Sequence, residues 1–297
     1  MPFLILVQAA PSPAPAYFQN PRLQESSGVV ISRTYPGILW THNDANNPPF
    51  LFVTDLRGRD RGRMLVPGVR GGDWEDLELG PCPRPTVPPA PSCLYIADTG
   101  DNDGSRSSVR IYAIPEPRPS TRPSDTLRTT APPIVLRLKY DDGPRDVEAM
   151  YIDPGDTTVY LVSKGNGKAR DGGNVIRLYR VGRHEWTKRT GVATPVQTLD
   201  IQPSPQQGRV VTGAAMTRDG ALVALRTYGE IYQFRRGPGG QLTPLGEPRN
   251  VGSLGGGGES IGFLNDSTLV LTHEASRGLP GRLYLLPFTP AARQSAR

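Results

Sequence analysis

The most constraining feature of the sequence is a layout of short segments that recurs five times along the chain. Each unit opens with an acidic or small residue and a short apolar strand, and then turns into a second strand that ends in polar residues. A third strand rich in Tyr, Phe and Leu follows. The five units open at residues 25–30, 73–77, 146–150, 212–216 and 259–263. Such repetition indicates an architecture built from one supersecondary unit.

The units also carry turn signals that are typical of antiparallel pairing. Asp219-Gly220 is a hairpin signal between the first two strands of the fourth unit, and residues 154–156 and 265–266 occupy the same place in two others. A fourth strand is visible at residues 64–66, 134–140 and 196–201. Radial repetition of small antiparallel sheets protects sheet edges, which is the β-propeller solution.

We therefore predict an all-β chain that forms a single β-propeller of five blades, each a four-stranded antiparallel sheet. Six blades are the alternative, if residues 115–133 hide a degenerate unit. The last unit runs out of chain before its fourth strand, so we expect the segment before Glu25 to supply that strand and close the ring. The predicted propeller spans residues 16–290, and residues 291–297 are expected to form a disordered tail.

The N-terminus and the cysteines bear on the compartment. Residues 1–15 are interpreted as a signal-peptide remnant or a disordered N-terminus, because an apolar run precedes small residues and prolines. No segment reaches the roughly 18 apolar residues of a membrane span. Cys82 and Cys93 flank a proline-rich loop that a disulfide would help to order. A disulfide fits an oxidising compartment, so we predict a secreted or periplasmic protein.

The charge pattern bears on partners. The formal net charge is +6, and the basic residues are scattered without a basic run or an interleaved aromatic stripe. This favours a small anionic molecule or an acidic glycan as partner and argues against nucleic acid. A genome that prefers Arg codons accounts for the same charge without any partner. We expect the protein to be a monomer.

The repeat predicts where polar side chains converge. In an antiparallel hairpin the start of the first strand and the end of the second lie at one edge. The starts place Glu25, Glu75, Glu148 and Glu259 in one ring at the channel, with Gly213 at the equivalent place. The strand ends place a second ring outside it: His42, Asp98, Lys164, Arg226 and His273. Six further polar residues lie beside that ring: Asn43, Asp44, Asp101, Asn102, Tyr228 and Glu274.

Converging carboxylates repel unless a cation neutralises them. Calcium suits such a set of carboxylate and amide oxygens. The predicted metal ligands are Glu25, Asp44, Glu75, Asp98, Glu148 and Glu259. The alternative is that these residues form turns, bond backbone amides of a neighbouring blade, or pair with Arg226 or Lys164.

The remaining polar residues suggest roles in catalysis and ligand binding. His42 or His273 is the candidate general base, because the imidazole pKa lies near neutrality. The full set of candidate catalytic residues is His42, His273, Tyr228, Arg226 and Lys164, and the candidate ligand-binding residues are Trp74, Asn43, Asp101, Asn102 and Glu274. Histidines hydrogen-bonded between blades, and a tryptophan that only plugs the channel, are the structural alternatives.

Four strings carry a family resemblance: Trp40-Thr-His-Asn-Asp44, Asp73-Trp-Glu-Asp76, Ala97-Asp-Thr-Gly-Asp-Asn102 and Asp146-Val-Glu-Ala149. They resemble strings in a group of secreted bacterial propellers that is distantly similar to phytase-like and calcium-dependent lactonase or esterase propellers. The resemblance implies an extracytoplasmic propeller with a calcium site. Phytase-like propellers also hold a basic cluster at the phosphate, for which only Lys164 and Arg226 are candidates on the predicted rings.

We therefore expect a calcium-supported hydrolase that acts on a small anionic ester, lactone or phosphoester. A second hypothesis is a non-catalytic extracytoplasmic propeller that binds a glycan or peptide. A third is a polysaccharide lyase, in which Arg226 neutralises a uronate and His42 or Tyr228 acts as base. A lyase requires Arg226 and Tyr228 in an open groove with His42 free. Fold analogy alone does not choose among the three.

Overall fold

The computed structural model describes residues 13–119, 127–165 and 174–290. Most of the predicted N-terminal leader and all of the predicted C-terminal tail lie outside these residues. Within the described ranges the chain forms β-strands and four short 3-10 helices, with no α-helix. The 3-10 helices are η1 (Arg183–Thr187), η2 (Pro205–Gln207), η3 (Pro238–Gly240) and η4 (Gly252–Leu254). No helix in this part of the chain has the length and apolarity that crossing a membrane requires.

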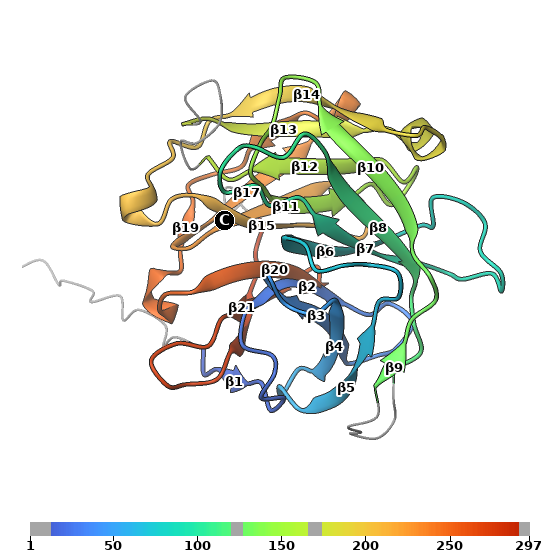
Figure 1. The fold of residues 1–297 in the computed structure, drawn as a ribbon. Helices are drawn as coiled ribbons and strands as arrows, with labels where there is room; N and C mark the ends of the chain where they lie inside the picture. The colour runs from blue at the N-terminus through green and yellow to red at the C-terminus, as the bar shows by residue number, and fades with distance from the viewer. Residues whose placement is uncertain (1–12, 120–126, 166–173, 291–297) are drawn as a thin grey trace, which may run out of the picture.

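The strands pair with their neighbours in the chain (Figure 1). The first sheet contains β2 (Ser26–Ile31), β3 (Ile38–Asn43), β4 (Phe50–Asp55) and β5 (Asp60–Leu65), with β9 (Arg128–Thr129) parallel to β5. The next meander contains β6 (Trp74–Gly80), β7 (Cys93–Asp98), β8 (Val109–Pro115) and β10 (Ile134–Tyr140). It is followed by β11 (Val147–Ile152), β12 (Val159–Ser163), β13 (Ile176–Val181) and β14 (Gly191–Leu199). Strand β14 pairs in parallel with β10 and joins the two meanders at their outer edges.

Two further sheets complete the chain. One contains β15 (Val211–Met216), β16 (Leu222–Thr227), β17 (Glu230–Arg236) and β18 (Leu242–Pro244), with β19 (Arg249–Asn250) also paired to β17. The other contains β20 (Gly258–Asn265), β21 (Thr268–His273), β22 (Arg282–Pro287) and β1 (Ala16–Tyr17).

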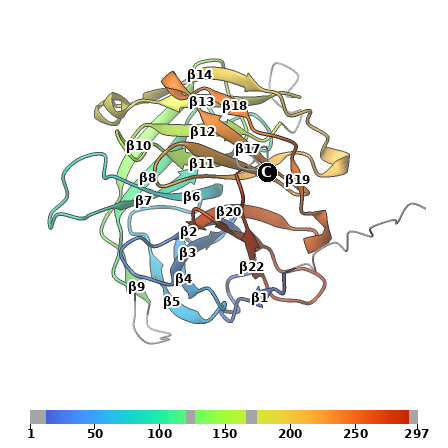
Figure 2. The same cartoon turned by 180° about the vertical axis from the view of Figure 1, so that it is seen from behind.

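The first strand of each meander lies toward the middle of the molecule. Strands β2, β6, β11, β15 and β20 pack in that order, and β20 returns to contact β2. Their labels gather near the centre of Figure 1, and the view from behind in Figure 2 shows the other strands spreading outward. The sheets therefore surround a central channel.

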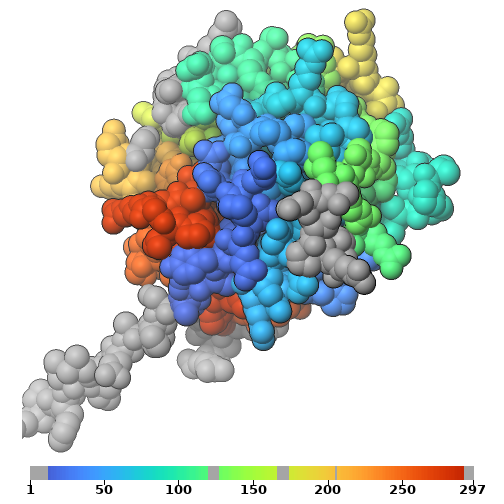
Figure 3. Space-filling model, turned by 60° about the horizontal axis from the view of Figure 1, so that its bottom comes forward, coloured from blue at the N-terminus to red at the C-terminus, as the bar shows by residue number. Residues whose placement is uncertain are grey.

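The N-terminal strand completes the last sheet, as the sequence predicted. Ala16 pairs with Leu283 and Tyr17 with Arg282 in antiparallel register. The N- and C-terminal parts of the chain consequently lie side by side at the surface, as the blue and red atoms of Figure 3 show. This arrangement pairs an edge that would otherwise be exposed.

The apolar core lies between neighbouring sheets. Trp40 of the first sheet is fully buried with Leu77 and Ile96 of the next meander. Because both faces of most blades are covered, the strands carry nearly continuous apolar runs instead of strict alternation. Cys82 and Cys93 form the predicted disulfide, which holds the base of the proline-rich loop. A disulfide suggests an oxidising compartment.

Candidate functional site

An irregularity at the start of every inner strand determines the site. The antiparallel register shifts between Trp74 and Asp76, so Glu75 is an extra, bulged residue. The same shift occurs near the start of the four other inner strands. The bulge positions are Ser27, Glu75, Glu148, Thr212 and Glu259. Bulges re-aim side chains, and here they bring three glutamates to one end of the channel.

The predicted inner ring therefore differs in two members. Ser27 occupies the bulge place where Glu25 was expected, and Thr212 occupies the place assigned to Gly213. Glu25 lies two residues earlier, is exposed, and accepts a hydrogen bond from the side-chain amide of Asn47. A bulge adds one residue to the strand and so changes which residue faces the channel; the first residue of the unit therefore does not line it.

The ends of the second strands form the outer part of the site. The amides of Asp44, Lys164 and Glu274 donate to the carbonyls of Glu25, Asp146 and Gly257, at 2.9, 3.0 and 2.9 Å. Tyr228 follows β16 at the corresponding place. His42 and Arg226 are two residues before this level, and His273 pairs with Gly258 one residue before it. The histidines and Arg226 thus lie one or two residues deeper along their strands than Lys164, although the sequence analysis placed all four in the same ring.

Carboxylates gather in two overlapping triads at this end of the channel. Asp44, Asp73 and Glu75 can each offer an oxygen within 4.8 Å of the others, and so can Glu75, Asp146 and Glu148. Glu75 belongs to both triads. Lys164 offsets one charge, because its Nζ lies 2.7 Å from Oε1 of Glu148. For Glu148 the predicted alternative of pairing with Lys164 is thus realised.

Burial and mutual repulsion raise the pKa values of these carboxyls. Burial is the main cause for Glu75 and Glu148, whose pKa values are raised well above the usual range. It also raises the pKa of Glu259 to about 7, with repulsion from Glu274 adding to the rise. The pKa of Glu274 likewise rises to about 7, and that of Asp73 to about 6. A bound cation would stabilise the ionised form of such buried carboxyls and lower their pKa values again.

Glu75 and Asp73 are the members of the cluster whose carboxylates have no donor among the described residues, and Oδ1 of Asp73 is buried without a partner. Glu75 is only 3% exposed, yet among the described residues no hydrogen-bond donor or cationic group lies within bonding distance of its carboxylate. Gly100 lies directly over it, since a Cβ there would overlap Oε1 of Glu75. Within the cluster, the carboxylates of Glu75 and Asp73 thus keep their oxygens available, and calcium prefers six to eight oxygen ligands.

Several predicted ligands are already occupied by protein partners. Asp98 accepts a hydrogen bond from Nη2 of Arg106 at 2.7 Å and from the hydroxyl of Tyr112 at 3.1 Å. Asp101 accepts from the amides of Ser105 and Arg106 and so orders its own loop, which also contains the exposed Asn102. The side-chain oxygen of Asn43 accepts hydrogen bonds from the backbone amides of Gln24 and Glu25, and its NH2 group donates to the carbonyl of Arg22.

The two candidate histidines and Arg226 are buried, and each makes at least one hydrogen bond, although Nε2 of His42 and Nε of Arg226 have no partner among the described residues. All three residues are 0% exposed. Nδ1 of His42 donates to the carbonyl of Asn43 at 2.9 Å, and Nη2 of Arg226 donates to Nε2 of His273 at 2.7 Å. Burial lowers the pKa of His42 to about 4 and that of His273 to about 3. Trp74 is 4% exposed and packs against His42 with ring centroids 5.5 Å apart, within the core between two blades.

An arginine-lined groove adjoins the acidic cluster, and the sequence did not predict it. The groove has a volume of about 750 Å³ and includes Asp73, which belongs to the cluster. Arg70, Arg106 and Arg110 line it. The sequence signal was available but ambiguous, because Arg106 and Arg110 follow the Asp98–Asn102 string on the same loop and strand.

Asp76 follows the bulged Glu75 on β6, and its carboxylate bonds across the channel to neighbouring inner strands. Its Oδ2 accepts from the amide of Met150 at 2.8 Å and from that of Ala214 at 3.2 Å, and its Oδ1 accepts from the amide of Leu77 at 2.8 Å. Asp76 is 0% exposed. One carboxylate therefore bonds the inner strands β11 and β15 from β6, and it separates the acidic cluster from the other end of the channel.

Comparisons with known proteins bear on the fold. No family model and no curated protein matches the sequence. The PQQ-bound aldose sugar dehydrogenase of Streptomyces coelicolor is similar in structure, with a TM-score of 0.53 and 14% identity over 89% of this chain and 94% of that chain. The β-propeller domain of Cps50 (Swd1) from Myceliophteria thermophila gives a TM-score of 0.43 and 12% identity, over 93% and 100% of the two chains. With the closed ring of inner strands, the first likeness confirms the β-propeller fold.

Proposed function

We propose that the chain is an extracytoplasmic β-propeller that binds calcium in the acidic cluster and hydrolyses a small anionic ester, lactone or phosphoester beside it. The observation that carries the proposal is Glu75, a buried carboxylate shared by two triads and without a protein donor among the described residues. The resemblance to phytase-like and lactonase-like propellers agrees with this proposal. The disulfide agrees with the secreted or periplasmic location.

The cation would be held by the two triads. One triad, of Asp44, Asp73 and Glu75, includes the groove residue Asp73, and the other adds Asp146 and Glu148 through the shared Glu75. Calcium accepts oxygen ligands at about 2.3–2.6 Å in flexible geometry, which suits carboxylates from different strands. Glu25 and Asp98 are left out of this ligand set, because neither belongs to a triad and because Asn47 and Arg106 contact them.

An anionic substrate fits the adjoining groove. Arg70 is exposed there, and Arg106 and Arg110 lie beside Asp98. Guanidinium groups bind carboxylates and phosphates with two hydrogen bonds. Because Asp73 belongs to both the groove and the cluster, a substrate anion held by Arg70 would have its reactive group near the cation.

The general base in this proposal is a carboxylate. A bound cation supplies an acidified water. His42 and His273 are fully buried, and burial lowers their pKa values to about 4 and about 3. Glu259 and Glu274, by contrast, flank the cluster with pKa values that burial raises to about 7. Their carboxylates have no hydrogen-bond donor among the described residues and so are free to accept a proton. A base with a pKa near the working pH is the most effective one.

Calcium binding is tested by isothermal titration and thermal melting of chelator-treated protein. Saturation at about a hundredfold over the dissociation constant adds about 2.7 kcal/mol of stability, which raises the midpoint by about 5 °C. Glu75→Gln should abolish that shift, and Glu247→Gln, a matched change at an exposed glutamate, should keep it. No shift in the unsubstituted protein, or an equal shift in Glu75→Gln, refutes the calcium site.

Hydrolysis is tested with p-nitrophenyl phosphate, p-nitrophenyl acetate and a simple lactone, with chelator added and then reversed. Arg70→Gln should raise KM for the anionic ester and leave the neutral ester unchanged, while Arg235→Gln, at an exposed arginine elsewhere, should change neither. Calcium binding without turnover of any substrate refutes the hydrolase and leaves the binding module. The lyase has weaker support, because Arg226 and His42 are buried instead of lining an open groove.

We also propose that the propeller has five blades. The closed order of β2, β6, β11, β15 and β20 supports this number, since each of these strands begins one antiparallel meander. In the stretch for which a sixth unit was considered, the described residues form only the short strand β9, which pairs at the edge of the first sheet.

A further inference from the structure

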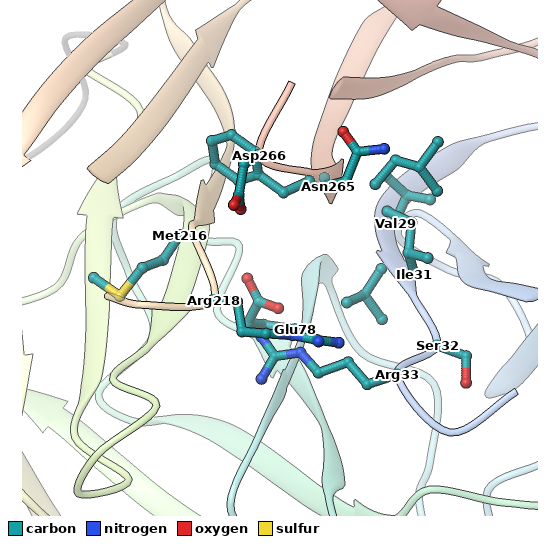
Figure 4. Close-up of a pocket in the computed structure, with 13 residues that line it drawn as sticks. Val29, Ile31, Ser32, Arg33, Glu78, Met216, Arg218, Asn265 and Asp266 are labelled. Atoms are coloured by element: carbon teal, nitrogen blue, oxygen red, sulfur yellow. The ribbon is translucent and has the colours of Figure 1, made fainter. Parts of the chain in front are cut away.

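A second pocket lies at the opposite end of the channel from the acidic cluster. It is a cavity of about 280 Å³ at the carboxyl ends of the inner strands β2, β6, β15 and β20 (Figure 4). Glu78 in this pocket and Glu75 in the cluster are three residues apart on β6, or roughly 10 Å. Asp76 lies between them and bonds across the channel, so the two sites are separate.

Two arginines on one side of this pocket make no hydrogen bond or close ion pair among the described residues, although Arg33 lies near enough to Glu78 to oppose the rise that burial causes in the pKa of that carboxyl. Arg33 follows β2 and Arg218 follows β15, and both side chains are exposed. Among the described residues neither guanidinium makes an ion pair or a hydrogen bond. Figure 4 shows both beside Glu78 on the same side of the cavity. Exposed arginines whose N–H groups have no hydrogen-bonded acceptor favour binding of a carboxylate or phosphate between them.

Two carboxyl groups balance these cations. Glu78 is 6% exposed, and its Oε1 accepts the amide of Leu79 at 2.8 Å. Asp266 is exposed on the opposite side of the cavity and has no partner among the described residues (Figure 4). A simple anion would meet these acids, and a simple cation would meet the arginines. A ligand that carries both charges satisfies both pairs.

The rest of the lining is apolar. Val29, Ile31, Met216 and Phe263 contribute side chains to the cavity. The volume of about 280 Å³ is just below the range of about 300–1,000 Å³ for drug-sized ligands, so it suits a smaller molecule. The pocket therefore suits a ligand with two opposite charges at one end and a short apolar chain at the other.

We propose that this pocket binds a free α-amino acid with an apolar side chain. Arg33 and Arg218 hold the carboxylate, Glu78 and Asp266 face the ammonium, and the apolar wall packs against the side chain. The site is independent of the calcium cluster, because Asp76 separates the two ends of the channel. Its failure would leave the proposed function unaffected.

The test is calorimetric titration of the full chain with L-leucine, N-acetyl-L-leucine and L-leucinamide. The acetylated compound lacks the ammonium, and the amide lacks the carboxylate. We expect L-leucine to bind, and both blocked compounds to bind at least about tenfold more weakly. Arg218→Gln and Asp266→Asn, both at exposed positions, should each weaken L-leucine by about tenfold, while the control Arg235→Gln should not.

Three results overturn the proposal. The first is no binding of L-leucine, L-methionine or L-phenylalanine at about 10 mM, well above the affinity expected of a built site. The second is binding that Arg218→Gln leaves unchanged. The third is inorganic phosphate or N-acetyl-L-leucine binding as tightly as L-leucine, which would indicate a plain anion site. Glu75→Gln is measured in parallel and should bind L-leucine normally, since it lies at the other end of the channel.

Discussion

The carboxylate of Asp76 should contribute more to stability than any exposed acidic residue. Asp76→Ala removes the acceptor of three backbone amides, those of Leu77, Met150 and Ala214. A buried donor left without a partner costs about 1–3 kcal/mol. Three such donors would cost about 3–9 kcal/mol. Relaxation of the strands and a water trapped in the space left by the carboxylate reduce this cost, so we expect the free energy of unfolding to fall by about 3–6 kcal/mol.

The expected loss depends on the position of the group and not on its charge. Burial raises the pKa of Asp76, and the three amides that donate to it oppose that rise. Asp76→Asn keeps one carbonyl oxygen but turns an NH2 toward amide donors. It should therefore also destabilise, by less than Asp76→Ala.

The assay is equilibrium unfolding in urea, followed by circular dichroism and fluorescence. The free energy of unfolding is taken from the midpoint, provided that the slope is unchanged. Asp266→Ala is the matched control, because that carboxylate is exposed and has no partner among the described residues. If Asp76→Ala lies within about 0.5 kcal/mol of the control, the carboxylate does not join the inner strands, and the reasoning fails.

Three more predictions follow from the same contacts. In chelator-treated protein, stability should fall as pH rises from about 4.5 to 7, because the folded state holds a proton on Glu259 more tightly than the unfolded chain does. Thermal melting at several pH values should show a loss of up to about 3 kcal/mol in the free energy of unfolding, and Glu259→Gln should remove this pH dependence. A rise in stability over this pH range contradicts the prediction. Gly100→Ala should weaken calcium binding at least about tenfold in calorimetry, because the new Cβ overlaps the Glu75 carboxylate; undiminished affinity would show that Glu75 is not a ligand. Replacing both Cys82 and Cys93 by Ser should cost about 2–3 kcal/mol in urea unfolding and leave calcium affinity unchanged, and a loss of that affinity would show that the loop supports the cluster.

The fold was predictable because every level of the sequence agreed. The recurring layout, the hairpin at Asp219-Gly220 and the missing last strand all indicated a ring closed by the N-terminal segment, and β1 pairs with β22 there. The disulfide was predictable because its two cysteines flank a loop that cannot form regular structure.

The site was predictable only to within one or two residues. The sequence placed Glu75, Glu148 and Glu259 together, and the structure does the same. The sequence could not show the bulges, which place Ser27 instead of Glu25 at the channel. The sequence also could not show that Arg106 already neutralises Asp98, since the loop between them must fold before the two meet. Asp73 and Asp146 were read only as the starts of units, although they join the triads.

The histidines show a different limit of sequence reasoning. A polar residue at the end of a strand can face the channel or the space between blades, and a change of one position decides which. His42 and His273 are buried against Trp74 and Tyr284, where burial keeps their rings neutral. Their residue type suggested a base, but their register makes them part of the core.

The most direct test of the account is a crystal structure of the protein soaked in a lanthanide or manganese salt, with the metal located by its anomalous signal. We predict one strong peak between the two triads, bonded to a carboxylate oxygen of Glu75 at about 2.3–2.6 Å and absent from Glu75→Gln crystals. A cluster without a peak, with Glu75 bonded only to protein groups, would contradict the central claim.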